Sequence, residues 1–196
     1  MGLSLLRLRR ATKDDYDEII TLINEAAEWL RTKNTDQWEQ PWPSEEDRRV
    51  RILRDLIAGK TLLALDEDLP VATITADLVD NPIWPPDTRR DRAVYACRLV
   101  VRRTHGGLGI GAALLDWVGQ HARWQYGAAW VRVDVWTTNE ALHAYYEQQG
   151  FEFCKFSDEL DNYPSTALFQ KATMGITTTG QPLLLFELSS ADRPLL

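Results

Sequence analysis

The stretch from residue 99 to residue 115 combines the end of a strand, a glycine-rich turn and the start of a helix. Strand-forming residues run from residue 93 to residue 101, and the turn GGLGIG follows at residues 106–111. Apolar residues then recur at helical spacing as far as about Tyr126. Glycines allow a backbone to approach an anion closely, and the N-terminus of a helix attracts negative charge. This stretch therefore predicts a site for a pyrophosphate-bearing ligand, although glycines also gather in turns for purely steric reasons.

The pattern around this unit predicts one mixed α/β domain over residues 1–196, with a core at about 3–171 and an extension at 172–196. Strands are expected at residues 3–9, 60–65, 71–79, 93–101, 130–136 and 151–156. Further helices are expected from residue 14 to about 34, from the Ser44 cap to Gly59, and from Thr138 or Asn139 to Gly150. Residues 166–171 and 182–188 are both strand-like, and the sequence does not decide which of them ends the sheet. A turn is expected at 174–180 and a loose tail at 189–196.

Composition narrows the classes of partner. The chain has 196 residues, of which 44% are hydrophobic and 26% are charged, as in an ordinary globular protein. The net charge of -7 disfavours a nucleic-acid partner and favours a cationic or amine substrate. The two cysteines and three histidines form no metal-spaced cluster, so no metal is expected. The chain shows neither a signal peptide nor an apolar run of membrane-spanning length, which favours a cytoplasmic location without membrane contact.

A dinucleotide-binding turn is one interpretation of the glycines. Gly107, Gly109 and Ala112 satisfy the G-x-G-x-x-A pattern, and the acidic Asp134 follows about 20 residues later. Against this interpretation, residues 102–105 separate the strand from the first glycine, and the chain that remains is too short to complete a doubly wound sheet. A phosphate-binding P-loop is excluded because no Lys-Ser or Lys-Thr pair follows Gly111.

A second interpretation explains more of the chain. Residues 101–114 resemble the acyl-CoA loop of the GCN5-related N-acetyltransferases (GNAT), V-x-P-x-x-[RQ]-G-x-G-[IL]-G-x-x-L. The matching residues are Val101, Gly107, Gly109, Ile110, Gly111 and Leu114. Arg103 stands where proline is common, and Gly106 stands where the family usually has arginine or glutamine. Downstream, the segment NEALHAYYEQQGF places Asn139, Tyr146, Gly150 and Phe151 at the spacing of a second family motif.

This resemblance implies a GNAT-like fold, with a mixed, mostly antiparallel central sheet flanked by helices. The sheet would be splayed between residues 93–101 and 130–136, and acetyl-CoA would lie in the opening as co-substrate. The residues expected to bind acetyl-CoA are Leu99, Val100, Val101, Gly106, Gly107, Leu108, Gly109, Ile110, Gly111, Asn139 and Tyr146. Because Gly106 removes a cation, Arg102, Arg103 or His105 is expected to replace its charge.

Direct acetyl transfer needs an acid for the departing thiolate and a base for the amine. The family spacing assigns the acid to Tyr146, whose phenol is protonated at pH 7, and the neighbouring Tyr145 is the alternative. Asn139 could bond the pantetheine arm, cap a helix, or do both. The base stays open, because the strand at 93–101 carries no carboxylate. The alternatives for the base are water molecules or the side chains of Glu25, Glu28, Asp36 and Asp77, and Cys97 is a less favoured acyl-carrying nucleophile.

The segment 29–38 resembles the variable acceptor side of the family. Trp29, Asp36 and Trp38 are accordingly expected to contact the substrate, although tryptophans there can also simply pin a loop to the core. The expected activity is transfer of acetyl from acetyl-CoA to a primary amine, and the acidic balance favours a small molecule as the acceptor. The alternative is a non-catalytic acyl-CoA-binding or regulatory module, and a homodimer is compatible with the fold.

Overall fold

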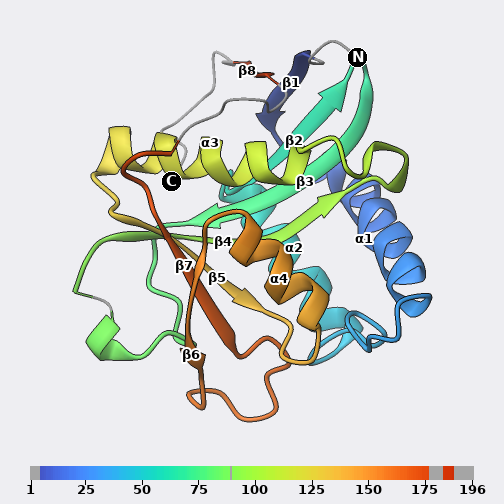
Figure 1. The fold of residues 1–196 in the computed structure, drawn as a ribbon. Coiled ribbons are helices and arrows are strands. Elements are labelled where there is room, and N and C mark those ends of the chain that lie inside the picture. Colours follow the sequence, from blue (N-terminus) through green and yellow to red (C-terminus); the bar gives the residue numbers. More distant parts are fainter. Residues whose placement is uncertain (1–4, 89, 177–182, 188–196) are drawn as a thin grey trace.

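The computed structural model describes residues 5–88, 90–176 and 183–187, and its strands form one eight-stranded sheet in the order β6-β7-β5-β4-β3-β2-β1-β8 (Figure 1). The strands are β1 (Leu5–Arg10), β2 (Thr61–Asp66), β3 (Leu69–Asp77), β4 (Ala93–Val101), β5 (Trp130–Val135), β6 (Glu152–Phe156), β7 (Ala167–Ala172) and β8 (Leu183–Phe186). The helices are α1 (Tyr16–Arg31), α2 (Glu45–Ile57), α3 (Ile110–Tyr126) and α4 (Glu140–Gln148). Only the pairs β4–β5 and β1–β8 are parallel, so the predicted mixed, mostly antiparallel sheet is confirmed.

Capping side chains set the starts of the 3-10 turn before α1 and of α2. Thr12 and Asp15 form a capping box in the short 3-10 turn η1 (Lys13–Asp15) that precedes α1. The Ser44 hydroxyl accepts a hydrogen bond of 3.1 Å from the backbone N–H of Asp47, as its predicted capping role requires. These caps satisfy backbone donors that have no partner within the helix, and so they fix where each helix begins.

The helices cover both faces of the sheet, and β2 shows how the faces are divided. Leu62 and Ala64 pack in the cluster that contains the apolar side of α3, whereas Leu63 and Leu65 pack with α1 and α2. This alternation follows from the period of two along a strand. Tyr146 of α4 belongs to the α3 cluster, so α3 and α4 share one face and α1 and α2 share the other (Figure 1).

The sheet opens between β4 and β5. These two strands pair only at Ala93, Val94 and Tyr95 of β4. Further along β4 its register with β3 shifts, and Arg98 adopts a φ of +50°, which marks a β-bulge. Beyond the bulge β4 remains paired with β3 alone, so the predicted splay lies at the carboxyl end of β4.

Both C-terminal strand-like segments join the sheet, at positions far apart. β7 lies between β5 and β6, whereas β8 pairs in parallel with β1 at the other edge, with Leu183 opposite Leu5. The predicted strand start at Leu3, residues 177–180 of the expected turn, the ends of the expected strand at 182 and 188, and the tail at 189–196 lie outside the described residues. Within the described ranges, no helix is long and apolar enough to cross a membrane.

Candidate active site

The glycine loop connects β4 to α3. A 3-10 turn, η3 (Arg103–His105), follows β4, and the exposed residues 106–109 then lead into the helix. Gly107 and Gly109 have φ values of +79° and +77°, a left-handed conformation that would strain residues with side chains. The first N–H groups of α3 have no partner within the helix. The loop can therefore hold an anionic group against the helix N-terminus.

Two basic residues of this loop are bonded to acidic neighbours. The Arg102 guanidinium donates to the carboxylates of Glu25 and Glu18 on α1, at 2.8 Å and 2.6 Å. Nε2 of His105 lies 3.2 Å from the carboxylate of Asp66 at the end of β2. These contacts hold the loop against α1 and β2.

Arg103 is the third basic residue, and it has no carboxylate partner within the described part of the chain. Its guanidinium lies 3.8 Å from the ring centroid of Trp29, a cation–π contact. Nη2 of Arg103 also lies 3.2 Å from the position that a Cβ on Gly106 would occupy. Arg103 thus brings a positive charge to the place where Gly106 lacks one.

The bulge leaves side chains at the centre of the sheet partly exposed, at Cys97, Arg98 and Leu99. The Arg98 guanidinium forms an ion pair with Asp55 of α2, which fixes the bulge against that helix. Val100 is buried against α1 and α2, whereas Leu99 packs toward α3. Past the three paired residues of β4, backbone groups on the β5 side have no partner among the described strands. An extended ligand arm can bond such groups as an added strand would.

Asn139 caps α4, as one of its predicted roles requires. Its side-chain oxygen accepts a hydrogen bond of 3.0 Å from the backbone N–H of Leu142. Its amide nitrogen donates to Oε1 of Gln37 at 2.6 Å, and both side chains are buried. Asn139 therefore ties the start of α4 to the loop that joins α1 and α2.

The two tyrosines of α4 point to different places. The Tyr145 hydroxyl lies 2.7 Å from the position that a Cβ on Gly111 would occupy, so it reaches the first turn of α3. Burial raises the pKa of Tyr145 to about 12, and the charge of Asp116 adds to this effect. A side chain at Gly111 would collide with this hydroxyl, which gives the glycine a packing reason beside any role in ligand binding.

Tyr146 is buried and interacts with groups on both strands that border the opening. Its side chain is 8% exposed, and its ring packs against Phe151 and Phe169. Burial raises its pKa, and charges on neighbouring groups, among them Asp134 of β5 and Cys97 of β4, raise the pKa further. The phenol of Tyr146 is therefore protonated at neutral pH and close to both strands that border the opening.

A part-buried carboxylate on β5 also borders the opening. The Asp134 carboxylate accepts hydrogen bonds from the Tyr163 hydroxyl at 2.6 Å and from Nδ2 of Asn81 at 3.1 Å. Burial raises the pKa of Asp134, while the Tyr163 hydrogen bond and the positive charge of Arg98 work in the opposite direction. Apart from its place in the dinucleotide pattern, Asp134 had no functional role among the expectations from the sequence.

The four carboxylates that the sequence offered as bases have other contacts or are exposed. Glu25 and Asp77 are held in ion pairs with basic residues. Asp36 accepts hydrogen bonds from the segment that leads into α4, and Glu28 lies exposed on α1. Each of these groups is therefore committed to another contact or open to solvent.

The three residues predicted to contact the acceptor lie in different parts of the structure. Trp29 contacts Arg103 beside the glycine loop. Trp38 has a φ of +63° and packs against the α1–α2 cluster. Asp36 accepts a hydrogen bond of 2.8 Å from the indole N–H of Trp136, next to the end of β5. Of the three, Asp36 is the one that the structure joins directly to the β5–α4 connection.

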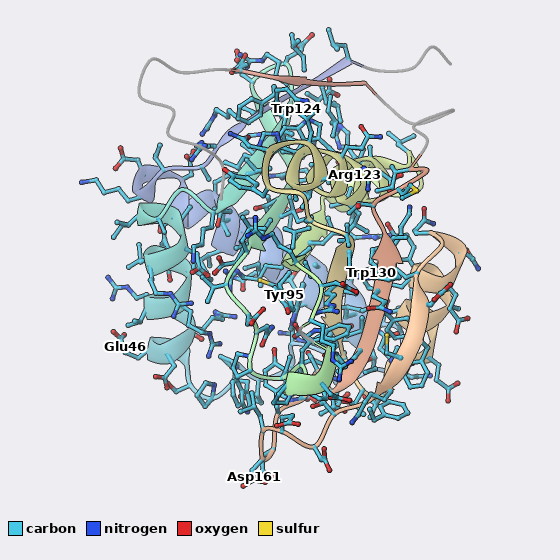
Figure 2. All side chains as sticks on the ribbon, turned by 90° about the vertical axis from the view of Figure 1, so that its left-hand side faces the viewer. Glu46, Tyr95, Arg123, Trp124, Trp130 and Asp161 are labelled. Atoms are coloured by element: carbon cyan, nitrogen blue, oxygen red, sulfur yellow. The ribbon has the colours of Figure 1, made fainter. Side chains whose placement is uncertain are left out.

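A surface hollow lined by Arg123, Trp124 and Gly127 lies at the C-terminal end of α3, opposite the glycine loop. Trp124 is 85% exposed there. Figure 2 shows Arg123 and Trp124 well away from Tyr95, the last residue of β4 that pairs with β5. The hollow is therefore separate from the opening of the sheet.

An open mixed sheet that splays beside a glycine loop at a helix N-terminus is the arrangement expected of an acetyltransferase. The Acetyltransferase (GNAT) family matches residues 22–151, more than half of the chain. The chain therefore belongs to the GNAT family. The resemblance inferred from the sequence is confirmed, and acetyl-CoA is supported as the co-substrate at the level of the family.

Relatives agree with this assignment. YesJ of Bacillus subtilis, described as an uncharacterized N-acetyltransferase, is 26% identical over 148 residues, which cover 73% of this chain and 79% of YesJ. A GNAT-family acetyltransferase from Listeria monocytogenes has a TM-score of 0.67 at 20% identity and covers 84% of this chain and 93% of its own. The PaiA N-acetyltransferase from Thermoplasma acidophilum, solved in complex with coenzyme A, has a TM-score of 0.63 at 16% identity. That match covers 88% of this chain and 99% of PaiA. These structural likenesses establish the fold alone.

Proposed function

We propose that this protein transfers an acetyl group from acetyl-CoA to a primary amine, by direct transfer while both substrates are bound. The observation that carries the proposal is the opening between β4 and β5, bordered by the Tyr146 phenol and continuous with the glycine loop at the end of β4. A non-catalytic acyl-CoA-binding module needs the loop but has no use for a protonated phenol at the opening. The transferase is therefore favoured over such a module.

The glycine loop and β4 supply the contacts that acetyl-CoA needs. The N–H groups of residues 107–111 fit the pyrophosphate, with Arg103 as the nearby cation. The β5-facing backbone of residues 99–101 fits the pantetheine arm and can donate to the thioester oxygen, on which negative charge develops. Tyr146 then lies on the side where the sulfur leaves.

The proton balance assigns a role to Tyr146. A primary ammonium and acetyl-CoA give an N-acetyl amide, free CoA thiol and one proton. The nitrogen forms its bond to the carbonyl carbon, and the bond between that carbon and sulfur breaks. The Tyr146 hydroxyl donates its proton to the departing sulfur, and the second N–H proton of the amine restores the phenol. Because its pKa is raised, Tyr146 holds this proton until the thiolate is formed.

The proposed acceptor is a small molecule. The net charge of -7 favours an approaching cation over a nucleic acid or an acidic acceptor. Asp36 accepts hydrogen bonds from Trp136 and Thr138, which lie between β5 and α4, so it is the predicted acceptor residue that supports a site beside the end of β5. Contact of the acceptor with Trp29 and Trp38, a cytoplasmic location and a homodimer stay predictions.

Calorimetric titration tests the ligand first, with acetyl-CoA as ligand and NADH as control. Micromolar binding of acetyl-CoA alone supports the proposal, and release of CoA with primary amines then establishes transfer. Binding of NADH alone would make the glycine loop a dinucleotide turn. Acetyl-CoA binding without CoA release over a broad amine panel would favour the regulatory module.

Replacing Tyr146 by phenylalanine tests the acid. The variant is expected to lower kcat by about 100-fold, in the range of general acid–base effects, and to change acetyl-CoA affinity by less than about twofold. Tyr145→Phe is the matched control, because it removes a phenol from the adjacent position, where the hydroxyl lies against α3. If Tyr146→Phe retains full turnover, Tyr146 is not the acid.

A further inference from the structure

The proposed reaction leaves one proton without a receiver. An alkylammonium has a pKa near 10 and must lose a proton before its nitrogen can attack. Tyr146 donates to sulfur and, with its raised pKa, is no receiver for the proton of an ammonium. A carboxylate at the opening can receive this proton directly, without a relay of water molecules, and the inference that follows rests on the proposed function.

Asp134 occupies the required position. Val133 and Val135 of β5 pack in the cluster on the α3 face, so alternation along the strand directs Asp134 to the opposite face. The buried Tyr146 packs in the cluster on the α3 face and lies close enough to Asp134 for the charge of Asp134 to affect its pKa. An acid and a carboxylate thus border the same gap in the sheet from its two sides.

The hydrogen bonds of Asp134 leave room for a further donor. Tyr163 donates to Oδ2 and Asn81 donates to Oδ1, at 2.6 Å and 3.1 Å. Two carboxylate oxygens together offer about four acceptor positions, and these two bonds use one on each oxygen. The two donors hold the carboxylate in a fixed orientation, which is what a proton acceptor in a transferase needs.

We propose that Asp134, oriented by Tyr163 and Asn81, binds the ammonium group of the acceptor and takes its proton. A carboxylate oxygen accepts one proton from the ammonium, and the freed lone pair forms the bond to the thioester carbonyl carbon. The nitrogen later loses a second proton, which restores Tyr146 after that phenol has protonated the sulfur. Asp134 returns its proton to solvent when the amide leaves, so the balance closes with one proton released.

The surroundings of Asp134 suit this task. Burial raises its pKa, which makes the carboxylate a stronger base than an exposed one. The charged or titratable groups that interact with it are Tyr163 of the loop after β6, Arg98 and Cys97 of β4, and Tyr146 of α4. Arg98 is itself paired with Asp55 of α2, which limits how far its charge can suppress the basicity of Asp134.

Asp134→Asn is the first test, because asparagine keeps the size and one acceptor oxygen but removes the charge. The probe is the fastest acceptor among benzylamine, tryptamine, spermidine and lysine. We expect kcat/KM to fall by about 100-fold or more, with acetyl-CoA affinity changed by less than about twofold. The matched control is Asp77→Asn on β3, a carboxylate paired with Lys60, which is expected to stay within about threefold of wild type.

The pH profile separates a base from a structural residue. The wild-type enzyme uses the ammonium form of the acceptor. Its kcat/KM is therefore expected to be independent of pH between the pKa of Asp134 and the pKa of the amine. The Asp134→Asn variant must use the free amine from solution, so its kcat/KM is expected to rise about tenfold for each pH unit over this interval. An unchanged profile in Asp134→Asn, or loss of the level region in Asp77→Asn instead, overturns the proposal.

Tyr163→Phe gives a second readout in a protein that retains Asp134. Loss of the hydroxyl removes a hydrogen bond that lowers the pKa of the carboxyl, so the acidic limb of the kcat/KM profile is expected to move to higher pH. A limb that stays in place contradicts the assignment of that limb to Asp134.

Amine binding tests the proposal independently of turnover. Benzylamine is titrated by calorimetry at pH 7 into the protein saturated with CoA, where it is present as the ammonium. Asp134→Asn is expected to weaken its binding at least about tenfold, and equal affinity in the two proteins overturns the proposal. If no amine supports CoA release by wild type, the proposed function fails, while this binding result still decides the role of Asp134.

Discussion

Replacing Arg103 by alanine tests whether this side chain supplies the positive charge that Gly106 does not. The Arg103 guanidinium is held over Trp29 at 3.8 Å and has no carboxylate partner within the described residues. At about 6 Å from a phosphate charge, Coulomb's law gives about 0.7 kcal/mol in water and about 2.8 kcal/mol at an effective dielectric constant of about 20. Because Arg103 is exposed and salt screens it, a value near 1 kcal/mol is expected. That corresponds to about fivefold weaker binding of acetyl-CoA.

The assay is calorimetric titration with acetyl-CoA at about 0.05 M and about 0.5 M salt. The difference between wild type and Arg103→Ala is expected to shrink at the higher salt concentration, because the interaction is electrostatic. Arg49→Ala, which removes an exposed arginine from α2, is the control for the change in net charge and is expected to bind as wild type does. Equal affinities of wild type and Arg103→Ala at low salt would refute the reasoning.

Two further predictions concern stability. Nζ of Lys171 lies 2.6 Å from the carboxylate of Asp116, whose side chain is 5% exposed. Because Lys171→Met leaves this buried carboxylate without its cation, the variant is expected to destabilise the fold by about 3 kcal/mol. Its Tm is expected to fall by about 6–12 °C. Thermal unfolding checks this, and the double variant with Asp116→Asn is expected to recover most of the loss. Asp15→Asn is expected to destabilise at pH 7, because the hydrogen bond from Arg9 lowers the pKa of Asp15. That stability is present above the unfolded pKa of about 3.9 and is lost as pH falls through the lower folded pKa, so urea midpoints of variant and wild type should converge near pH 2.

Local signals predicted the parts of the fold that are built from short segments. The glycine loop and α3 follow from the left-handed glycines and the apolar spacing after them, and Ser44 and Asn139 act as caps as expected. The second motif also placed Tyr146 on a short helix, as α4 shows. Each of these features is decided by residues within about ten positions of one another, so the sequence carries them directly.

The carboxylate beside the opening depends on packing that a sequence pattern does not contain. The strand at 93–101 has no carboxylate, and the group at the opening comes from the neighbouring strand, at Asp134. A signal was available, because in WVRVDVW the valines alternate with Arg132 and Asp134, which puts two charged side chains on one face of a central strand. Their partners Asn81 and Tyr163 come from separate loops, whose approach no local pattern specifies.

Trp29 is a second residue whose contacts depend on tertiary packing that a sequence pattern does not contain. Its place at the end of the first helix, in the segment 29–38, suggested contact with the acceptor, which stays a prediction, and its ring also contacts Arg103. Because Arg103 comes from a turn more than 70 positions away, only the docking of α1 against the end of β4 reveals the contact.

The parallel pairing of β8 with β1 joins residue 183 to residue 5, so the first and last of the described strands are neighbours in the sheet. During synthesis on the ribosome, β1 can pair with β2 early, but its other edge has to wait until all the other described strands have been made. Pairing over such a separation must overcome a large loop-closure entropy unless the intervening chain is already folded. β8 is therefore expected to dock last onto a nearly finished sheet, and until then β1 is an open edge to which another chain could add.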